Sequence, residues 1–304
     1  MGDSFHSLSP ALKLFFPGEF RELYRKVVQT ENQPILETLL AEMKISLRID
    51  PGDAHRIPAT GPVIAVANHP FGMLDGVILG ALALRVRSDV KILANHLLGA
   101  IPELARHCLF VDPFDTKESK HTNSRSLKQA ITHLRTGGML IIFPAGEVSH
   151  WQFKHGEISD PEWSDVVPRL VQATRSAVLP VLFMGTNSVP FHLVGLIHPM
   201  LRTARLPREL LNKSGKEIEI RVRQSHLRRK ALQHSQRRSG DRLCSLAHLP
   251  ARSARRDENI VLVVEASNAG EPRSSSGGAA CFRAEYSGRD GRAGEERSAS
   301  LRKS

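Results

Sequence analysis

The sequence predicts an α/β fold whose sheet is mostly parallel and flanked by helices. Between residues 46 and 223, short runs rich in β-branched residues alternate with helix-like stretches, as in repeated βα units. Polar segments directly follow four of the predicted strands, where open α/β folds form their clefts. Residues 1–45 and 224–304 differ in character from this part, so we expect one central domain with an extension on either side.

Seven strands are expected in the central domain. Each is a short apolar or alternating run bounded by polar or turn-forming residues. They lie at Ser46–Ile49, Val63–Ala67, Val90–Ala94, Cys108–Val111, Met139–Phe143, Val178–Met184 and Glu217–Val222.

Four helices are expected between these strands. The third is the clearest, because its apolar residues recur on one face and Gly137 follows its end. The four are predicted at Asp75–Val86, Leu97–His107, Ser124–Thr136 and Val166–Ser176.

Residues 1–45 contain two amphipathic helix patterns. One lies between Glu19 and Gln29, with basic residues opposite its apolar face, and the other follows Pro34. Such helices could dip into a membrane interface. They could equally pack on the domain, because surface helices of soluble proteins have the same pattern.

Residues 224–304 are rich in Arg, Ser and Gly and poor in apolar residues, except for Ile260–Val264. A segment with so little surface to bury is expected to be disordered. The last predicted strand is also followed by no convincing covering helix. We therefore hypothesise that this tail is a shifted reading frame or an unrelated extension.

The charge is concentrated in the tail. Residues 224–304 hold 16 Lys+Arg against 9 Asp+Glu, which leaves 26 against 22 for the first 223 residues. The domain is thus only mildly basic, so nucleic acid is not an expected partner. The three cysteines form no metal-binding or disulfide pattern, and no histidine pair has metal-ligand spacing, so no metal site is expected.

No apolar run approaches the ~18 residues needed to span a bilayer, and the N-terminus lacks the features of a signal peptide. We expect a cytoplasmic protein that lies peripherally on the inner face of the membrane.

The candidate chemistry centres on His69, in the segment Asn68–Asp75. Pro70 and Gly72 break the chain between the strand and the next helix, so His69 lies in a tight turn and Asp75 near the helix start. A carboxylate there could fix one imidazole nitrogen, leaving the other to take a proton from an attacking hydroxyl. The other polar segments, 112–115, 144–149 and 185–188, should lie at the same sheet edge.

Three motifs resemble those of the lysophospholipid, or glycerolipid, acyltransferase superfamily. His69–Gly76 resembles its His/Asp motif, Phe143–Ser149 its Phe-Pro-x-Gly block, and Val178–Phe183 its late Val/Ile-Pro-Val strand. The form of these motifs is most similar to the bacterial putative-hemolysin or aminolipid acyltransferase subgroup. The resemblance covers roughly residues 46–223.

The resemblance implies transfer of a fatty acyl group from acyl-CoA or acyl-acyl carrier protein to the hydroxyl of a lysolipid, with no bound cofactor. It makes His69 the general base and Asp75 its orienting partner, while Glu147 either contacts the acceptor or supports the His69 loop. Asn187 and Ser188 could line the acceptor cleft or serve a helix cap. Substrate binding is expected of Asn68, Phe71, Gly72, Phe143, Pro144, Gly146, Glu147, Asn187 and Ser188.

Two departures from the main branch of the superfamily are visible. Five residues instead of four separate His69 from Asp75, and Val148 stands where an Arg would help to hold a phosphate. A simple phosphate monoester is therefore a poor candidate for the acceptor.

Other classes of protein fit less well. The chain has no Gly-x-Ser-x-Gly elbow, phosphate loop or dinucleotide-binding turn, which argues against serine hydrolases, kinases and dehydrogenases. Two alternatives remain: a non-catalytic, peripheral lipid-binding or membrane-perturbing protein of the hemolysin-like kind, and a protein whose Arg-rich tail is a nucleic-acid-binding arm.

Overall fold

The computed structural model describes residues 16–29, 34–112, 117–223, 260–265 and 281–286. Predictions for residues 1–15, for 113–116 and for most of the tail lie outside the described residues, and the reading-frame hypothesis stays a prediction.

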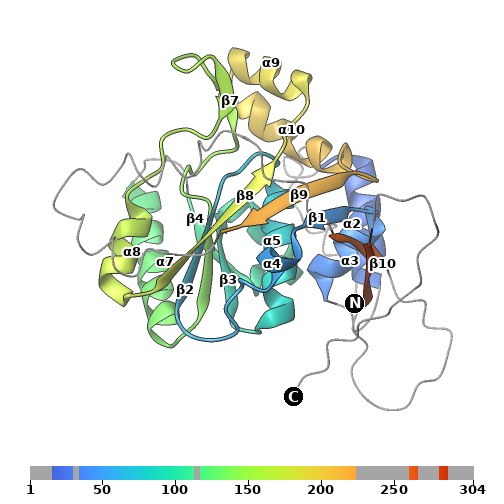
Figure 1. Ribbon diagram of the computed structural model, residues 1–304. Helices are drawn as coiled ribbons and strands as arrows, with labels where there is room; N and C mark the ends of the chain where they lie inside the picture. Colours follow the sequence, from blue (N-terminus) through green and yellow to red (C-terminus); the bar gives the residue numbers. More distant parts are fainter. Residues whose placement is uncertain (1–15, 30–33, 113–116, 224–259, 266–280, 287–304) are drawn as a thin grey trace.

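The strands of the central domain form one sheet together with two tail strands, β10 (Ile260–Glu265) and β11 (Cys281–Tyr286). The strand order is β11-β10-β1-β9-β8-β2-β5-β3-β4 (Figure 1). All seven strands expected in the domain are present, with ends shifted by at most one residue. They are β1 (Ser46–Ile49), β2 (Val63–Ala67), β3 (Val90–Asn95), β4 (Cys108–Val111), β5 (Met139–Ile142), β8 (Ala177–Met184) and β9 (Glu217–Val222).

The sheet is mostly parallel, as predicted. Strands β8, β2, β5, β3 and β4 all run in one direction, so their carboxyl ends share one edge. β9 is antiparallel to β8 because the chain leaves β8 at that edge, folds into two helices and re-enters from the same side. β1 is parallel to β9.

Helices cover both faces of the sheet and give it two apolar layers. Along β2, Ile64 and Val66 belong to one core cluster, while Val63, Ala65 and Ala67 belong to the other. The larger cluster includes α3 (Ile35–Glu42) and α5 (Met73–Val86); the smaller includes α7 (Lys117–Arg135) and α8 (Val166–Thr174). Burial on both faces explains why the central strands are continuous apolar runs.

The N-terminal helices use their apolar faces to pack on the domain. Phe20 and Val27 of α2 (Gly18–Gln29) and Leu36 and Leu40 of α3 are all buried in the larger core. The packing alternative left open by the sequence is thus the arrangement seen for the described part of residues 1–45.

All four predicted helices have different bounds, although α8 differs only in ending at Thr174 rather than Ser176. The one expected at Leu97–His107 is split into a 3₁₀ turn, His96–Ala100, and α6 (Pro102–Ala105). Pro102 causes the break, since proline cannot donate a backbone hydrogen bond and suits the first turn of a new helix. α7 begins seven residues before Ser124, over a polar stretch without periodicity, and α5 begins at Met73 rather than Asp75.

Several elements were not predicted. They are α4 (Pro51–Ala54), the hairpin of β6 (His150–Gln152) and β7 (Glu157–Ser159), and two consecutive helices, α9 (Val189–Ile197) and α10 (Pro199–Leu211). In Figure 1 the hairpin, α9 and α10 stand together at the top, above the carboxyl ends of β8 and its parallel neighbours.

Two short segments of the tail are strands. β10 (Ile260–Glu265) pairs antiparallel with β1, and β11 (Cys281–Tyr286) pairs antiparallel with β10. β10 coincides with the one apolar, β-branched run of the tail, which is the composition that favours a strand.

Candidate active site

The turn between β2 and α5 holds the predicted centre of chemistry. Gly72 has a φ of 77°, which favours glycine, and a side chain there would lie 2.9 Å from Cδ2 of Leu206. Asp75 follows in the first turn of α5, where its Oδ2 accepts hydrogen bonds from the backbone N–H groups of Phe71 (2.9 Å) and Gly72 (3.0 Å). The carboxylate thus caps the helix and fixes the turn that carries His69.

His69 and Asp75 lie together, as the sequence predicted. Nδ1 of His69 is 3.0 Å from Oδ2 of Asp75, although the N–H direction deviates from a straight hydrogen bond. Asp75 is fully buried, whereas the His69 side chain is 19% exposed. The extra residue between the two is therefore absorbed in the turn without separating them.

Burial raises the pKa of the Asp75 carboxyl above its usual range, because desolvation disfavours the charged form. The neighbouring His69 and the two backbone N–H donors oppose this shift. A carboxylate held by these groups is well placed to fix the imidazole tautomer in which Nδ1 carries the proton and Nε2 is basic.

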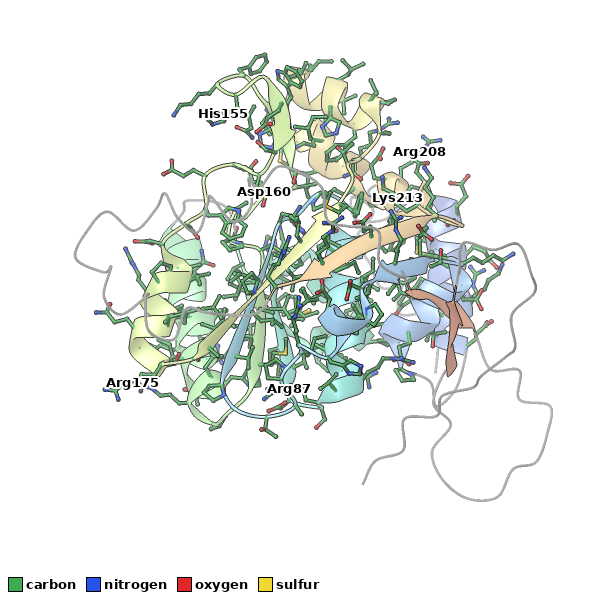
Figure 2. The ribbon with its side chains drawn as sticks, in the orientation of Figure 1. Arg87, His155, Asp160, Arg175, Arg208 and Lys213 are labelled. Atoms are coloured by element: carbon green, nitrogen blue, oxygen red, sulfur yellow. The ribbon has the colours of Figure 1, made fainter. Side chains whose placement is uncertain are left out.

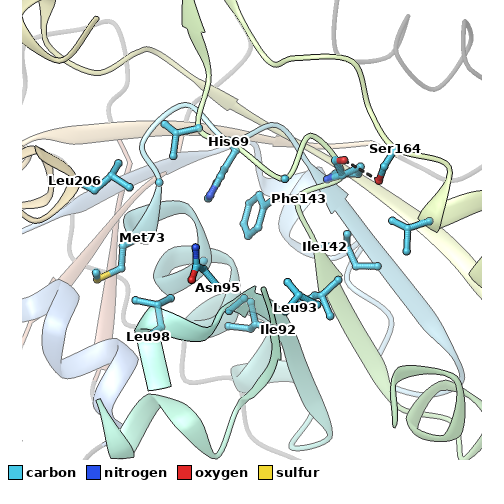
Figure 3. Close-up of a pocket in the computed structure, with 18 of the residues that line it drawn as sticks. His69, Met73, Ile92, Leu93, Asn95, Leu98, Ile142, Phe143, Ser164 and Leu206 are labelled. Atoms are coloured by element: carbon cyan, nitrogen blue, oxygen red, sulfur yellow. Dashed lines mark hydrogen bonds between the residues drawn. The ribbon is translucent and has the colours of Figure 1, made fainter. Parts of the chain in front are cut away.

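The imidazole ring is also fixed by an aromatic neighbour. The rings of His69 and Phe143 stack with centroids 4.2 Å apart and planes inclined by 27°. Figure 3 shows both rings beside the cavity that the next paragraphs describe. Phe143 follows β5 directly, so two adjacent parallel strands supply the pair.

Asp160 organises the backbone around His69 and was not identified from the sequence. Its Oδ1 accepts a hydrogen bond from the backbone N–H of His69 (3.1 Å) and another from the Ser149 hydroxyl, while Oδ2 accepts one from Nε1 of Trp163 (3.0 Å). The N–H of Ser149 donates to the His69 carbonyl at 2.9 Å. The backbone N–H and carbonyl of His69 are therefore both hydrogen-bonded to residues that follow β5 in the chain.

The Phe-Pro block lies beside His69, but its members have different roles. The Pro144 carbonyl accepts hydrogen bonds from both the N–H and the hydroxyl of Ser164, each at 3.0 Å. The Gly146 N–H donates to the Phe143 carbonyl (3.0 Å), so it is not available to hold an oxyanion. Glu147 pairs with Arg202 of α10 at 2.5 Å, and this links the block to α10.

Asn68 and Phe71 have structural contacts. The Asn68 amide both donates to the Phe183 carbonyl (2.9 Å) and accepts from the Phe183 N–H (2.7 Å), which extends the pairing of β2 with β8. Phe71 is buried, and Gly185 leaves room for its ring.

Ser188 is the N-terminal cap residue of α9, where its N–H and hydroxyl both donate to the buried Glu209, at 3.0 and 2.6 Å. Ser188 thus occupies the cap position of α9, but its side chain makes no capping hydrogen bond to the helix. Asn187 is buried, and neither polar atom of its amide has a hydrogen-bond partner among the described residues.

Lys213 is a second residue that the sequence did not reveal. Its Nζ donates to the Thr186 carbonyl at 2.8 Å and lies 4.6 Å from the centre of the Phe71 ring. Burial lowers the pKa of Lys213, while the charges of Glu209 and Asp75 oppose that effect. The Lys213 side chain is therefore held against Phe71, which belongs to the turn between His69 and Asp75.

An apolar cavity of about 420 Å³ opens beside His69. Its walls come from β3, the 3₁₀ turn, β5 and α10, and polar side chains are few among them (Figure 3). The residues that line it include Met73, Ile92, Leu93, Leu98, Leu127, Ile142, Phe143, Val148 and Leu206. Of the predicted binding residues, Gly72, Phe143, Pro144 and Gly146 line this cavity, whereas Asn68, Phe71, Glu147, Asn187 and Ser188 do not.

The arrangement can deprotonate a hydroxyl next to an apolar chain. A histidine oriented by a buried carboxylate is a general base, and the cavity suits an acyl chain better than a polar metabolite. Within the described residues, no three His, Cys, Asp or Glu side chains gather so that they could hold a metal ion.

Part of the chain matches a known protein family. Residues 48–183 match the family model described as Acyltransferase. This match covers much of the α/β domain and supports its resemblance to the glycerolipid acyltransferase superfamily.

Two relatives have more specific names. The chain is 33% identical over 137 residues to a lyso-glycine lipid O-acyltransferase of Phocaeicola vulgatus, covering 45% of this chain and 47% of the relative. It is 32% identical over 150 residues to a lyso-glycine lipid O-acyltransferase of Bacteroides thetaiotaomicron, covering 49% and 52%. The chain thus spans about half the length of these curated relatives.

Proposed function

We propose that this protein is an O-acyltransferase that moves a fatty acyl group from an acyl thioester to the hydroxyl of a lysolipid. The observation that carries the proposal is the 3.0 Å contact between His69 and the buried Asp75 at the mouth of an apolar cavity. The acyltransferase family match and the two lysolipid acyltransferase relatives support the same reaction.

In the proposed reaction, Nε2 of His69 takes the proton from the acceptor hydroxyl as its oxygen attacks the thioester carbonyl. The carbon–sulfur bond then breaks, an ester is left on the acceptor, and the departing thiolate takes the proton from His69. Asp75 stabilises the imidazolium that exists between these steps. The thioester is already activated, so the mechanism needs no nucleophile from the protein.

The acceptor is proposed to be a lyso-aminolipid, meaning an N-acylated amino acid that carries a free hydroxyl. Two features support it: both relatives are named for a lyso-glycine lipid, and Val148 lines the apolar cavity where a phosphate-binding Arg would otherwise stand. The donor is proposed to be acyl-CoA or acyl-acyl carrier protein. No bound cofactor takes part.

The test is an assay of the purified full chain with each donor and with two acceptors, a hydroxylated N-acylglycine and lysophosphatidate. The expected result is ester formation on the N-acylglycine, lost by ~10²-fold or more in His69→Ala. His96→Ala is the matched control, because His96 is an exposed histidine outside the cavity lining. Equal product from His69→Ala and the unchanged protein would rule out His69 as the general base, whereas no product from either would leave the non-catalytic lipid-binding alternative.

A further inference from the structure

The end of the molecule above the cavity carries an exposed apolar surface, here called the crest. It is formed by α9, the start of α10 and the β6–β7 hairpin, which lie together in Figure 1 and are in contact with one another. Its exposed residues are Trp151, Phe153, Ile158, Val189, Leu193, Leu196, Ile197, Met200 and Leu201. Phe153, Val189 and Ile197 are 80%, 70% and 77% exposed.

The exposed apolar residues of α9 lie along one side of the helix and are not scattered over its surface. Val189, Leu193, Leu196 and Ile197 of α9 recur at the three- and four-residue spacing that places side chains on one side of a helix. In most helices such a stripe faces the core, but here it faces outward, and α9 has no charged residue. A contiguous apolar surface of this kind marks an interaction site.

The crest adjoins the candidate active site through two elements. α10 carries Met200 and Leu201 in its first turn, and one turn later Thr203 and Leu206 line the cavity. The hairpin begins one residue after Ser149, whose N–H binds the His69 carbonyl. Whatever covers the crest therefore lies next to the cavity mouth.

The charges around the crest fit an anionic lipid surface. Arg202 and Arg205 are paired with Glu147 and Glu209. Arg208 of α10 and Lys154 of the hairpin are exposed, with one exposed acid, Glu157, in the hairpin. Figure 2 shows His155 and Arg208 at this end of the molecule. Exposed Trp and aliphatic side chains with basic residues beside them are the composition of segments that lie in a membrane interface.

We propose that the crest seats the protein on the surface of a lipid bilayer, so that the acceptor reaches His69 directly from the membrane. This inference rests on the proposed function, because a lipid acceptor resides in a bilayer. α9 has nine residues, about 13.5 Å, so it lies in the interface rather than across a core ~30 Å thick. No helix in the described ranges is long and apolar enough to cross a membrane.

This surface differs from the one that the sequence suggested. The apolar faces of α2 and α3 are buried in the core, and Val28 is the one large hydrophobic side chain of α2 or α3 that is counted as exposed. The crest carries nine exposed large hydrophobic side chains.

The test compares co-sedimentation of the full chain with vesicles of phosphatidylcholine and phosphatidylglycerol. Phe153→Glu/Leu193→Glu/Ile197→Glu should lower the bound fraction at least tenfold, because charge is costly in the interface. Val86→Glu, on α5, and Val28→Glu, on α2, are matched exposed controls that should bind like the unchanged protein. Equal binding by the crest variant, or loss of binding in Val28→Glu alone, would overturn the proposal.

Two further measurements separate this inference from its rivals and from the proposed function. Light scattering should give one mass for the unchanged protein and the crest variant; a larger oligomer that the crest variant breaks would make the crest a contact between copies instead. With acceptor dispersed in detergent, the crest variant should keep its activity, whereas His69→Ala should lose activity and still bind vesicles. Activity in His69→Ala would defeat the proposed reaction while leaving the vesicle result in place.

Discussion

Asp160 holds the backbone of His69 in place, since its Oδ1 accepts the His69 N–H at 3.1 Å across 91 residues of sequence. The same oxygen accepts the Ser149 hydroxyl, and Ser149 in turn binds the His69 carbonyl. Asp160 does not line the cavity, so we regard it as a positioning residue. Its buried carboxylate determines where the imidazole lies relative to the cavity.

Asp160→Ala is expected to lower kcat on the order of 10²-fold with little change in KM, because a displacement of about 1 Å in a reacting group has that effect. The measurement is steady-state kinetics over pH, together with the melting temperature. Asp160→Asn should recover part of the rate, since an amide oxygen can still accept the His69 N–H.

Trp163→Phe provides the control for this prediction. It removes the donor to Oδ2 and leaves both contacts of Oδ1 with the His69 loop intact. It should reduce stability with a smaller effect on kcat. If Asp160→Ala lowers the melting temperature but leaves kcat unchanged, the positioning role is wrong.

The sequence revealed the His69–Asp75 pair because both residues belong to one short turn, and the Pro and Gly around them define that turn locally. The parallel strands were equally visible, since burial on both faces makes them continuous apolar runs. Asp160 and Lys213 could not be found in this way. Their contacts with the turn depend on how distant segments fold over the sheet edge, and no local pattern records that.

The helices α9 and α10 were missed for a different reason. α9 is apolar on the side that faces outward, so it lacks the polar face by which a surface helix is recognised. α10 begins at Pro199 and contains Pro207, which reads as a break in a helical pattern. Glu147 was predicted to touch the acceptor or support the loop, and its partner Arg202 became visible only with α10 in place.

Gly72→Ala should impair both folding and activity. The residue has a φ of 77°, and the added Cβ would lie 2.9 Å from Leu206 and 3.2 Å from Val148. Gly61→Ala is a close control, because Gly61 has a φ of 83° but open space around its Cβ. Backbone strain alone should cost Gly61→Ala about 1–2 kcal/mol of unfolding free energy.

Chemical denaturation should therefore show a larger loss for Gly72→Ala than for Gly61→Ala. Adding Leu206→Ala to Gly72→Ala should restore the part of that loss that comes from crowding. Equal losses in the two glycine variants would mean that Leu206 yields freely and that backbone strain is the whole effect.

The Cys108 thiol should react slowly at neutral pH. Burial raises its pKa to about 11, an effect that the charge of Lys91 opposes, against a reference of 9.0. The thiolate is the reactive form, so the folded protein should be alkylated about 100-fold more slowly near pH 8 than the unfolded chain. Mass spectrometry of the Cys108 peptide after iodoacetamide treatment, with and without guanidinium, measures the ratio.

The raised pKa of Cys108 also determines the direction in which the stability of the protein changes with pH. The folded state favours the neutral thiol. The contribution of Cys108 to the free energy of unfolding is therefore fully present below about pH 9 and is lost as the pH rises toward about 11. Cys108→Ala should flatten the stability profile in that window. Rapid alkylation of folded Cys108 near pH 8 would contradict the assignment.

Leu98 should control the length of the acyl chain that the proposed acyltransferase prefers. It is half-buried, belongs to the 3₁₀ turn after β3, and points into the cavity beside His69 in Figure 3. Leu98→Trp should fill part of the 420 Å³ and shift the preference toward shorter donors, whereas Leu98→Ala should shift it toward longer ones. Because the effect is on binding of the chain, it should appear in KM more than in kcat for donors that still fit.

The measurement is a competition assay with a series of saturated acyl thioesters and either variant. Leu39→Trp is the control, because Leu39 is also partly buried but contributes to a separate, smaller apolar pocket formed with α2. A shift in preference for the Leu98 variants with none for Leu39→Trp would support binding of the acyl chain in this cavity. If the chain-length profile is the same in all three variants, the acyl chain lies elsewhere and the cavity beside His69 has another occupant.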